Sequence, residues 1–185
     1  MRRVRRLRWI VLLGAGGLVA AMGWEWLRPT RAEPEWEIGS APPEFVLPRL
    51  AGGVESVESL RGQVYFVHFW ATWCGACRTE APALERLYRR LQGDGFELLG
   101  VTIDAPEARQ SVEAFRRQLG LSYPILLDPE REVYRRYRVR GLPETFLVDA
   151  QGRLRAHFAG PRDWKQPRFA RAIETLLHAS ERTER

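Results

Sequence analysis

The chain has 185 residues, of which 45% are hydrophobic, enough for one domain of ordinary size with a substantial core. Residues 1–37 carry seven Arg and four Glu, and residues 38–185 carry 22 basic and 19 acidic side chains, so each part has a net charge of +3. The larger part is therefore only mildly basic. This charge distribution argues against nucleic-acid binding, and no nucleic-acid partner is predicted.

An uncharged run of 16 residues, Trp9–Trp24, follows five arginines near the start of the chain. As a helix it would be about 24 Å long, which is short against a hydrocarbon core of about 30 Å. Tryptophans stand at both ends of the run, where indoles favour the membrane interface. We expect residues 1–27 to form a single-pass anchor in the inner membrane, with the arginines in the cytoplasm.

The alternative for the same segment is a cleaved signal peptide, because Val19-Ala20-Ala21 offers small residues for a cleavage site. Both interpretations place the rest of the chain in the periplasm or otherwise outside the cytoplasm. Residues 28–37 contain two prolines and alternating charges, which predicts a tether. The folded domain is then expected over residues 38–185.

The remaining pattern alternates strands with helices and ends in a hairpin and a helix, which predicts a three-layer α/β domain. Pro82 lies inside one helical pattern and predicts a kink there. Gly120 is expected to end the helix before it. Strands are expected over residues 45–47, 54–57, 63–70, 96–103, 123–127, 144–148 and 154–158, and helices over 78–91, 107–119, 128–137 and 165–178.

Cys74 and Cys77 are the only two cysteines, and they stand where an apolar run gives way to a helical pattern. A zinc site would need about four ligands, and no histidine is paired with them at metal spacing. A disulfide closing so small a ring contributes little as a structural cross-link. The pair therefore predicts redox chemistry, with the thiolate of Cys74 favoured by the start of the helix. No metal and no cofactor are predicted.

The sequence Phe69-Trp70-Ala71-Thr72-Trp73-Cys74-Gly75-Ala76-Cys77, with Pro82 after it, resembles the thioredoxin superfamily. The segment 141–149, Gly-Leu-Pro-Glu-Thr-Phe-Leu-Val-Asp, resembles the cis-proline loop and following strand of that superfamily. Residues 39–45 and His157-Phe158-Ala159-Gly160 are most similar to the membrane-anchored DsbE/CcmG type, with its ResA and TlpA relatives. The resemblance implies a thioredoxin-like fold with a central mixed sheet, an N-terminal strand extension and an inserted helix and strand.

The resemblance also implies a reaction and its partners. Cys74 attacks a partner disulfide and Cys77 resolves the mixed disulfide, so that the protein ends oxidised. The implied substrate is the haem-attachment Cys-x-x-Cys-His segment of apocytochrome c, or another disulfide-bearing protein. A membrane electron donor of the DsbD/CcdA type would reduce the cysteine pair again.

Other site residues are assigned through the same resemblance. A cis bond before Pro143 would bring Leu142 and Pro143 against the sulfurs, and Trp73 is assigned to substrate contact. Glu80 is either an acid in the first turn of the helix or a proton acceptor for Cys77. Glu144 is either a surface strand residue or an acid in the substrate groove.

His68 occupies the position at which thioredoxins place a buried Asp. It is either a core histidine satisfied by one hydrogen bond or a neutral base that tunes the proton affinity of Cys77. Two other functions stay open at this point. One is a general periplasmic disulfide reductase or oxidase, and the other is a copper-handling module that uses both cysteines and a histidine.

Overall fold

The computed structural model of the chain describes residues 36–183, with side chains described up to residue 180. The predicted anchor, residues 1–27, and the predicted tether up to residue 35 lie outside the described residues. Within the described part of the chain, no helix has the length and apolar character needed to span a membrane.

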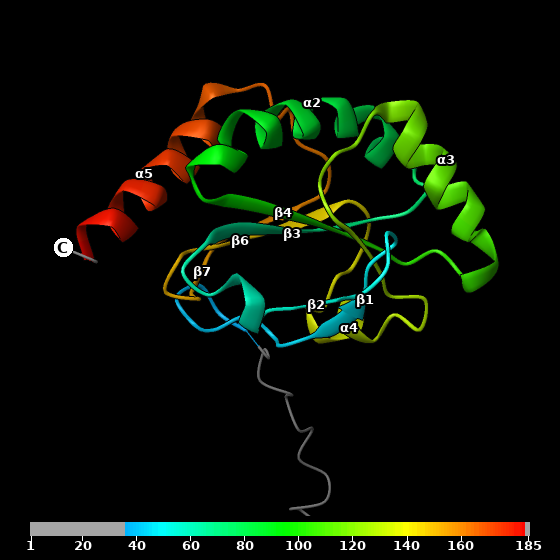
Figure 1. Ribbon diagram of the computed structural model, residues 1–185, viewed down its shortest axis with the longest axis horizontal. Coiled ribbons are helices and arrows are strands. Elements are labelled where there is room, and N and C mark those ends of the chain that lie inside the picture. Colours follow the sequence, from blue (N-terminus) through cyan, green and yellow to red (C-terminus); the bar gives the residue numbers. More distant parts are fainter. Residues whose placement is uncertain (1–35, 184–185) are drawn as a thin grey trace, which may run out of the picture. The chain divides into compact units, whose positions relative to one another are not determined.

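Five strands form a mixed sheet in the order β5-β4-β3-β6-β7 (Figure 1). The central strands β3 and β4 are parallel to each other and to β5, whereas β6 pairs antiparallel with both β3 and β7. This confirms the predicted α/β class with a mixed sheet. The strands are β3 (Val64–Trp70), β4 (Phe96–Thr102), β5 (Ile125–Leu127), β6 (Glu144–Val148) and β7 (Leu154–Ala159).

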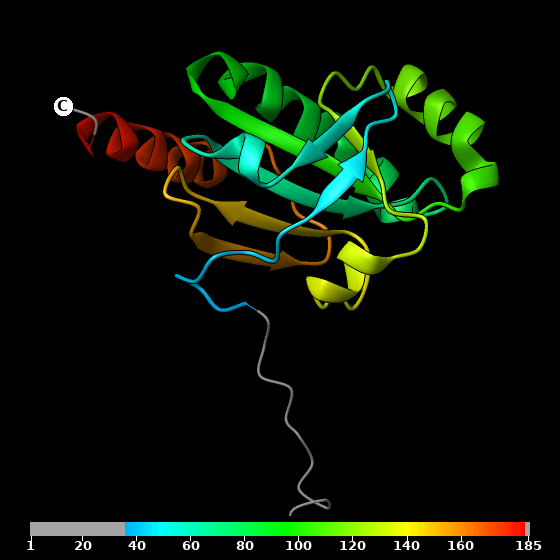
Figure 2. The ribbon, with the colours of Figure 1, turned by 60° about the horizontal axis from the view of Figure 1, so that its bottom comes forward.

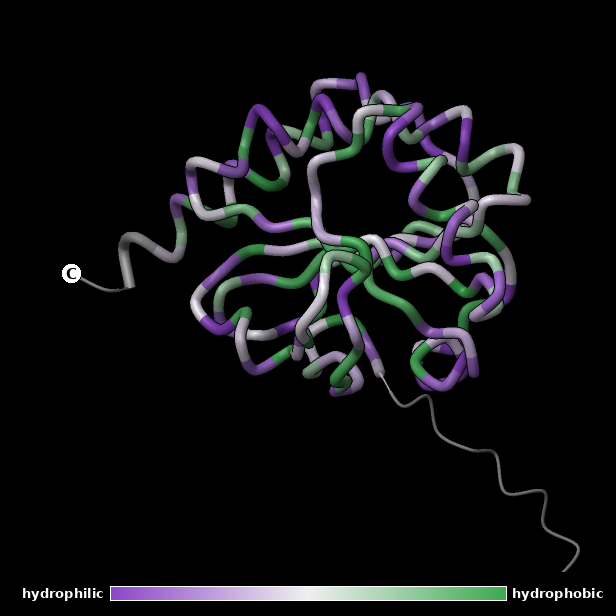
Figure 3. Tube along the Cα trace, turned by 45° about the vertical axis from the view of Figure 1, so that its right-hand side comes forward, coloured by the Kyte–Doolittle hydropathy of each residue, from purple (hydrophilic) through white to green (hydrophobic). Residues whose placement is uncertain are grey.

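Three layers result because β3 is buried along its whole length and alternate residues point to opposite faces. Phe66 and Trp70 point into one core, beneath α2 (Gly75–Leu91), α3 (Arg109–Leu119) and α5 (Pro167–Thr183). Val67 and Phe69 point into the other core, beneath α4 (Glu132–Arg136) and a short hairpin. Figure 3 shows the apolar residues concentrated on the strands and the polar residues on the outer sides of the helices.

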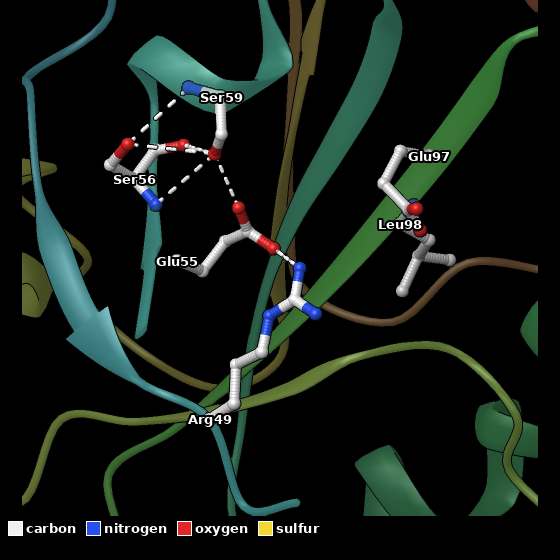
Figure 4. Close-up of polar contacts among 6 residues, drawn as sticks. All are labelled: Arg49, Glu55, Ser56, Ser59, Glu97 and Leu98. Carbon is white, nitrogen blue, oxygen red and sulfur yellow. Dashed lines mark hydrogen bonds and ion pairs between the residues drawn. The ribbon is translucent and has the colours of Figure 1, made fainter. Parts of the chain in front are cut away.

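The N-terminal strand extension is a two-stranded antiparallel hairpin, β1 (Val46–Pro48) and β2 (Val54–Ser56), on the face of the sheet that also carries α4 (Figure 2). Its Glu55 is buried and accepts hydrogen bonds from the Arg49 guanidinium and the Ser59 hydroxyl (Figure 4). A buried carboxylate needs such partners, so these contacts fix the hairpin to the 3₁₀ turn Glu58–Leu60 that follows it. No motif in the sequence predicted this cluster.

The inserted helix and strand are α3 and β5, which lie between β4 and α4 in the chain. Gly120 ends α3 with a φ of +62°, a left-handed conformation that favours glycine. Two further 3₁₀ turns flank β4: Gln92–Asp94 connects α2 to it, and Pro106–Ala108 connects it to α3. β5 then forms the edge of the sheet beside β4.

The helix predicted over residues 128–137 is wrong in its start, because α4 begins only at Glu132. The carboxylate of Asp128 accepts hydrogen bonds from the backbone N–H groups of Glu132, Val133 and Tyr134. Asp128 therefore caps a later helix across an intervening turn instead of opening one at Pro129. α2 starts earlier than predicted, at Gly75, and runs unbroken across Pro82.

Trp36, within the range predicted as a tether, packs against the folded domain. Its indole N–H donates to the carbonyl of Tyr137 at 2.8 Å, and its ring contacts Phe146 and His157 edge to face. The folded domain therefore includes Trp36, two residues before the predicted boundary at residue 38.

Candidate active site

The candidate site lies at one edge of the sheet, where four connecting segments meet. β3 ends at Trp70, opposite Thr102 at the end of β4. β6 begins at Glu144, which pairs with Phe69 on one side and with Ala159 at the end of β7 on the other. The segments that follow β3, β4 and β7, together with the segment that precedes β6, therefore emerge at the same edge.

Cys74 and Cys77 form a disulfide at the start of α2, with Cα atoms 5.3 Å apart. Cys74 is the N-cap residue, and its sulfur accepts a hydrogen bond from the Cys77 backbone N–H at 3.2 Å. Residue Cys74 is 8% exposed and residue Cys77 is 1% exposed. Cys74 is therefore the sulfur that an incoming partner can reach, as expected for the attacking thiol.

Asp104 fixes the loop that leads from β3 into the disulfide. Its carboxylate accepts from the Thr72 backbone N–H at 2.9 Å and from the Thr72 hydroxyl at 2.7 Å. Trp73 follows in this loop and is 64% exposed, beside the more accessible sulfur. A large exposed indole at this place is suited to contact a partner protein.

Glu80 lies one turn after Cys77 on α2, and residues three apart on a helix share a face. Its side chain is buried, so it is not the solvated first-turn acid of the simpler interpretation. Oε2 accepts from the Arg162 backbone N–H at 2.8 Å, whereas Oε1 has no hydrogen-bond partner. Burial raises the pKa of Glu80 to about 7, against the opposing effects of Arg162 and the nearby Trp164 indole.

His68 lies on β3 beneath α2 and is also buried. Its Nδ1 is 2.9 Å from the Thr145 hydroxyl oxygen, and its Nε2 is 3.8 Å from Glu80 Oε1. Burial lowers the pKa of His68 to about 3, so the ring is neutral at physiological pH. The structure thus gives His68 one hydrogen bond, as the simpler interpretation expects, and also places it beside Glu80.

The Leu142–Pro143 peptide bond is cis, and the Pro143 carbonyl accepts from the Gly160 backbone N–H at 2.9 Å. The segment containing this bond and the segment of the disulfide emerge at the same edge of the sheet. Leu142 is partly buried against the core cluster that includes both cysteines. The turn of residues 140–143, which precedes β6, is therefore fixed by a hydrogen bond from Gly160, the residue directly after β7.

Glu144 differs from both of its predicted roles, because its side chain is buried and its carboxylate is already occupied. Oε1 accepts from the backbone N–H groups of Arg140 and Gly141 at 2.9 and 3.2 Å. Oε2 lies 2.8 Å from His157 Nε2 on β7. Glu144 is neither a surface strand residue nor an acid exposed in the substrate groove. Instead, its buried carboxylate fixes the backbone of the residues before Pro143.

Among residues 36–183, no three His, Cys, Asp or Glu side chains are grouped so that they could hold a metal ion. His157 and His178 are the other histidines of the chain. The first is engaged with Glu144, as described above.

A family model described as AhpC/TSA matches residues 38–157, which include the cysteine pair, the Pro143 turn and most of the sheet. The chain belongs to the AhpC/TSA family. Within this family it is similar to the thiol-disulfide oxidoreductase ResA of Geobacillus thermodenitrificans, with 37% identity over 123 residues that cover 66% of this chain and 70% of the relative.

Two further comparisons also find proteins of thiol-disulfide chemistry. ResA of Bacillus thuringiensis subsp. konkukian is 31% identical over 157 residues, covering 85% of this chain and 87% of the relative. A thiol:disulfide interchange protein of the thioredoxin family from Chlorobium tepidum matches with a TM-score of 0.65 and 28% identity, covering 76% of this chain and 98% of that structure. The chain is a thiol-disulfide oxidoreductase with a thioredoxin-like fold, and Cys74 and Cys77 are its Cys-x-x-Cys pair.

Four functional contacts of the site were not predicted from the sequence. Asp104 stands directly after a predicted strand, which is a position where polar side chains often serve a site, and this signal was available. Thr145 and Arg162 carried no such signal, because their partners, His68 on β3 and Glu80 on α2, lie far away in the chain. His157 belonged to a quoted motif, but its pairing with Glu144 depends on the register of β6 and β7.

Proposed function

We propose that this oxidoreductase is held at the outer side of the cytoplasmic membrane and reduces the haem-attachment disulfide of apocytochrome c. The resemblance of residues 39–45 and 157–160 to the DsbE/CcmG type supports the substrate. The arginines and the uncharged run of the N-terminal segment support the location. A membrane donor of the DsbD/CcdA type would return the cysteine pair to its reduced form.

The observation that carries the reductive mechanism is the unequal burial of the two cysteines, with a buried carboxyl, that of Glu80, one helical turn after Cys77. In the reduced protein, the Cys74 thiolate attacks one sulfur of the substrate disulfide. The substrate S–S bond breaks, one substrate thiolate leaves and takes a proton, and a mixed disulfide forms with Cys74. The greater exposure of residue Cys74 favours it for this first contact.

Cys77 then completes the reaction from its buried position. Its thiol gives a proton to the Glu80 carboxylate, and the resulting thiolate attacks the Cys74 sulfur. The Cys74–Cys77 bond forms, the mixed disulfide breaks, and the second substrate thiolate leaves and is protonated. Two electrons pass from the protein to the substrate. A carboxyl with a pKa of about 7 is suited to accept and release this proton near neutral pH.

The turn before β6 supplies the surface for the substrate chain. Glu144 fixes the backbone of Arg140 and Gly141, so the exposed edge that leads to Pro143 is held in one conformation. An extended peptide can add its own backbone hydrogen bonds to such an edge. The exposed Trp73 lies on the neighbouring loop and would contact the same peptide.

A trapping experiment tests the substrate. The full chain carrying Cys77→Ala is reduced and mixed with an oxidised peptide that contains Cys-x-x-Cys-His, in competition with an equal amount of the peptide in which His is replaced by Ala. Preferential capture of the first peptide on Cys74, measured by mass spectrometry, is expected. Equal capture of both peptides, or capture of only unrelated disulfide proteins from the periplasm, would instead indicate a general oxidoreductase.

A reporter fusion tests the location. Alkaline phosphatase, which folds only outside the cytoplasm, is fused after Arg185 and should be active and remain with the membrane fraction. The mass of the mature protein separates an intact anchor from a cleaved signal peptide. An inactive fusion in a cell that makes the chain stably would contradict an extracytoplasmic domain.

A further inference from the structure

One buried oxygen at the site has no hydrogen-bond partner. Glu80 Oε2 is bound by the Arg162 backbone N–H, but Oε1 is buried and unpaired. The buried, unpaired indole N–H of Trp164 lies near the Glu80 carboxyl, and His68 Nε2 lies 3.8 Å from Oε1. A shift of the carboxyl by about 1 Å would bring the pair within hydrogen-bond range. An unpaired polar atom in a core is costly, so its position beside a ring nitrogen requires an explanation.

We propose that His68 and Thr145 form a tautomeric relay that offers Glu80 Oε1 a hydrogen-bond partner in both of its protonation states. The relay rests on three facts of geometry. His68 lies between Glu80 and Thr145, one ring nitrogen faces each of them, and all three side chains are buried. Thr145 makes His68 different from an ordinary buried histidine, because a hydroxyl can either donate or accept.

The two states of the relay differ in the position of one ring proton. When Glu80 is protonated, its Oε1–H can donate to His68 Nε2, and the ring then carries its proton on Nδ1 and donates to Thr145. When Glu80 is ionised, Nε2–H donates to Oε1, and the Thr145 hydroxyl turns to donate to Nδ1. The imidazole stays neutral in both states, so no positive charge enters the core.

Several groups face this centre from other elements. Arg162, on the segment between β7 and α5, and the Trp164 indole both lie near the Glu80 carboxyl. Tyr123, on the segment before β5, lies close enough for the charge of Glu80 to contribute to its raised pKa. Cys77 lies one turn back on α2. Burial keeps the pKa of His68 near 3 and that of Tyr123 above its ordinary value, whereas the pKa of Glu80 is about 7, so of these three groups Glu80 is the one that titrates near neutral pH.

The link between the relay and Cys77 rests on the proposed function, in which Glu80 accepts the proton of Cys77. When the Cys77 thiol gives its proton to Glu80, Nε2 gives its proton to water and Nδ1 takes one up from water, so that Oε1–H donates to Nε2 and Nδ1–H donates to the Thr145 oxygen. When Glu80 later releases the proton, the ring returns to the other tautomer. His68 and Thr145 are positioning residues in this scheme, because they act through Glu80 and touch neither the substrate nor the sulfurs.

Nitrogen NMR of the oxidised full chain, held in a lipid nanodisc, reports the tautomer directly. The ring nitrogens of the three histidines are labelled, and His68 is assigned by comparison with His157→Gln and His178→Gln. Below the titration midpoint of Glu80, Nδ1 of His68 should carry the proton, and above it Nε2 should carry the proton. A single tautomer on both sides of the midpoint would overturn the relay. The midpoint itself is followed by the infrared carbonyl band of the buried carboxylic acid, which Glu80→Gln should remove.

Thr145→Val and Thr145→Ser form a matched pair of variants. Valine keeps the shape but cannot accept from Nδ1–H, and a buried N–H without an acceptor is costly, so the ring should keep its proton on Nε2 at every pH. Ionised Glu80 is then favoured, and its midpoint should move down by about one pH unit, the effect of one hydrogen bond lost from one protonation state. Serine should restore both the tautomer change and the midpoint.

The outcomes separate the relay from the proposed function. An unchanged midpoint in a folded Thr145→Val protein would overturn the relay. If instead the tautomer changes as expected but Glu80→Gln resolves mixed disulfides at the rate and with the pH profile of the parent, the relay stands and the role of Glu80 as proton acceptor for Cys77 fails.

Discussion

Glu144 Oε2 lies 2.8 Å from His157 Nε2 across the last two strands of the sheet. The other oxygen of the same carboxylate holds the backbone of Arg140 and Gly141. A strand residue and an acid that directly follows Pro143 therefore act together to support the turn that emerges at the same edge of the sheet as the disulfide. This contact gives Glu144 a supporting role in place of the groove role that the sequence motif indicated.

Removing the Glu144 carboxylate should cost both stability and substrate capture. Glu144→Ala leaves two backbone N–H groups and His157 without their buried acceptor, so the free energy of unfolding should fall by about 2–4 kcal/mol in urea. Glu144→Gln keeps one acceptor oxygen and should lose less. The exposed Glu130 gives the control, and Glu130→Ala should leave stability unchanged. Equal losses for Glu144→Ala and Glu130→Ala would contradict the support of the turn.

Asp104 should control the loop before the disulfide. Asp104→Ala removes the acceptor of both the Thr72 hydroxyl and its backbone N–H, and should lower the free energy of unfolding by about 1–3 kcal/mol. The rate at which a partner thiol opens the Cys74–Cys77 bond should also change, because the loop that carries Trp73 loses its anchor. Asp94→Ala, at an exposed position, is the matched control. A normal rate and stability in Asp104→Ala would show that the loop is held by other contacts.

The active-site pair Glu80 and His68 should produce an unusual pH dependence of stability. The pKa of Glu80 is raised from 4.5 to about 7, so between these values the folded protein binds the extra proton and stability falls as pH rises. The pKa of His68 is lowered from 6.5 to about 3, so between these values the unfolded chain binds the extra proton and stability rises with pH. Between pH 4.5 and 6.5 the two effects cancel.

Replacing either residue of the pair should reveal the pH dependence of stability that the other residue causes. In Glu80→Gln, stability should rise with pH from 4.5 to 6.5 by about 1.4 kcal/mol per pH unit more than in the parent, because only His68 remains. In His68→Gln, it should fall over the same interval by a similar amount. Chemical denaturation of the oxidised proteins at several pH values measures these differences. Parallel pH profiles for the parent and Glu80→Gln would contradict a protonated Glu80 in the folded state.

Gly100 lies at a close approach in the core between β4 and its neighbours. A Cβ at this position would lie 2.8 Å from Tyr123 Cε2 and 3.1 Å from Trp70 Nε1. Gly100→Ala should therefore lower the free energy of unfolding by about 1–3 kcal/mol, measured in urea, because both rings are fixed in the core. Gly93→Ala, where a Cβ meets nothing within 4 Å, is the control. Similar stability of the two variants would contradict the tight packing.

Most elements of the fold could be predicted from local patterns in the sequence. The apolar run 63–70, the helical pattern after Cys77 and the glycine at residue 120 each correspond to the element that was expected. The start of α4 could not be predicted, because Asp128 and Pro129 fit both a helix start and a capped turn, and only the three N–H bonds to Asp128 decide between them.

The site itself was only half predictable. The cysteines and the proline turn belong to short motifs, but the partners of Glu80 come from residues distant in the chain. Arg162 is 82 residues from Glu80, and Thr145 is 77 residues from His68. These contacts depend on which strands pair and in which register, and a single sequence does not reveal such pairings. The burial of Glu144 and Glu80 was hidden for the same reason.

We propose that Cys74 and Cys77 exchange two electrons with partner thiols and that the protein acts as a reductant. Equilibration of the full chain with glutathione buffers, followed by mass spectrometry of the alkylated cysteines, tests it most directly. We expect one reversible two-electron transition near the reducing end of the range for this fold, closer to about −270 mV than to −120 mV. A disulfide that stays closed in the folded protein at every potential, or a transition near −120 mV, would contradict the claim.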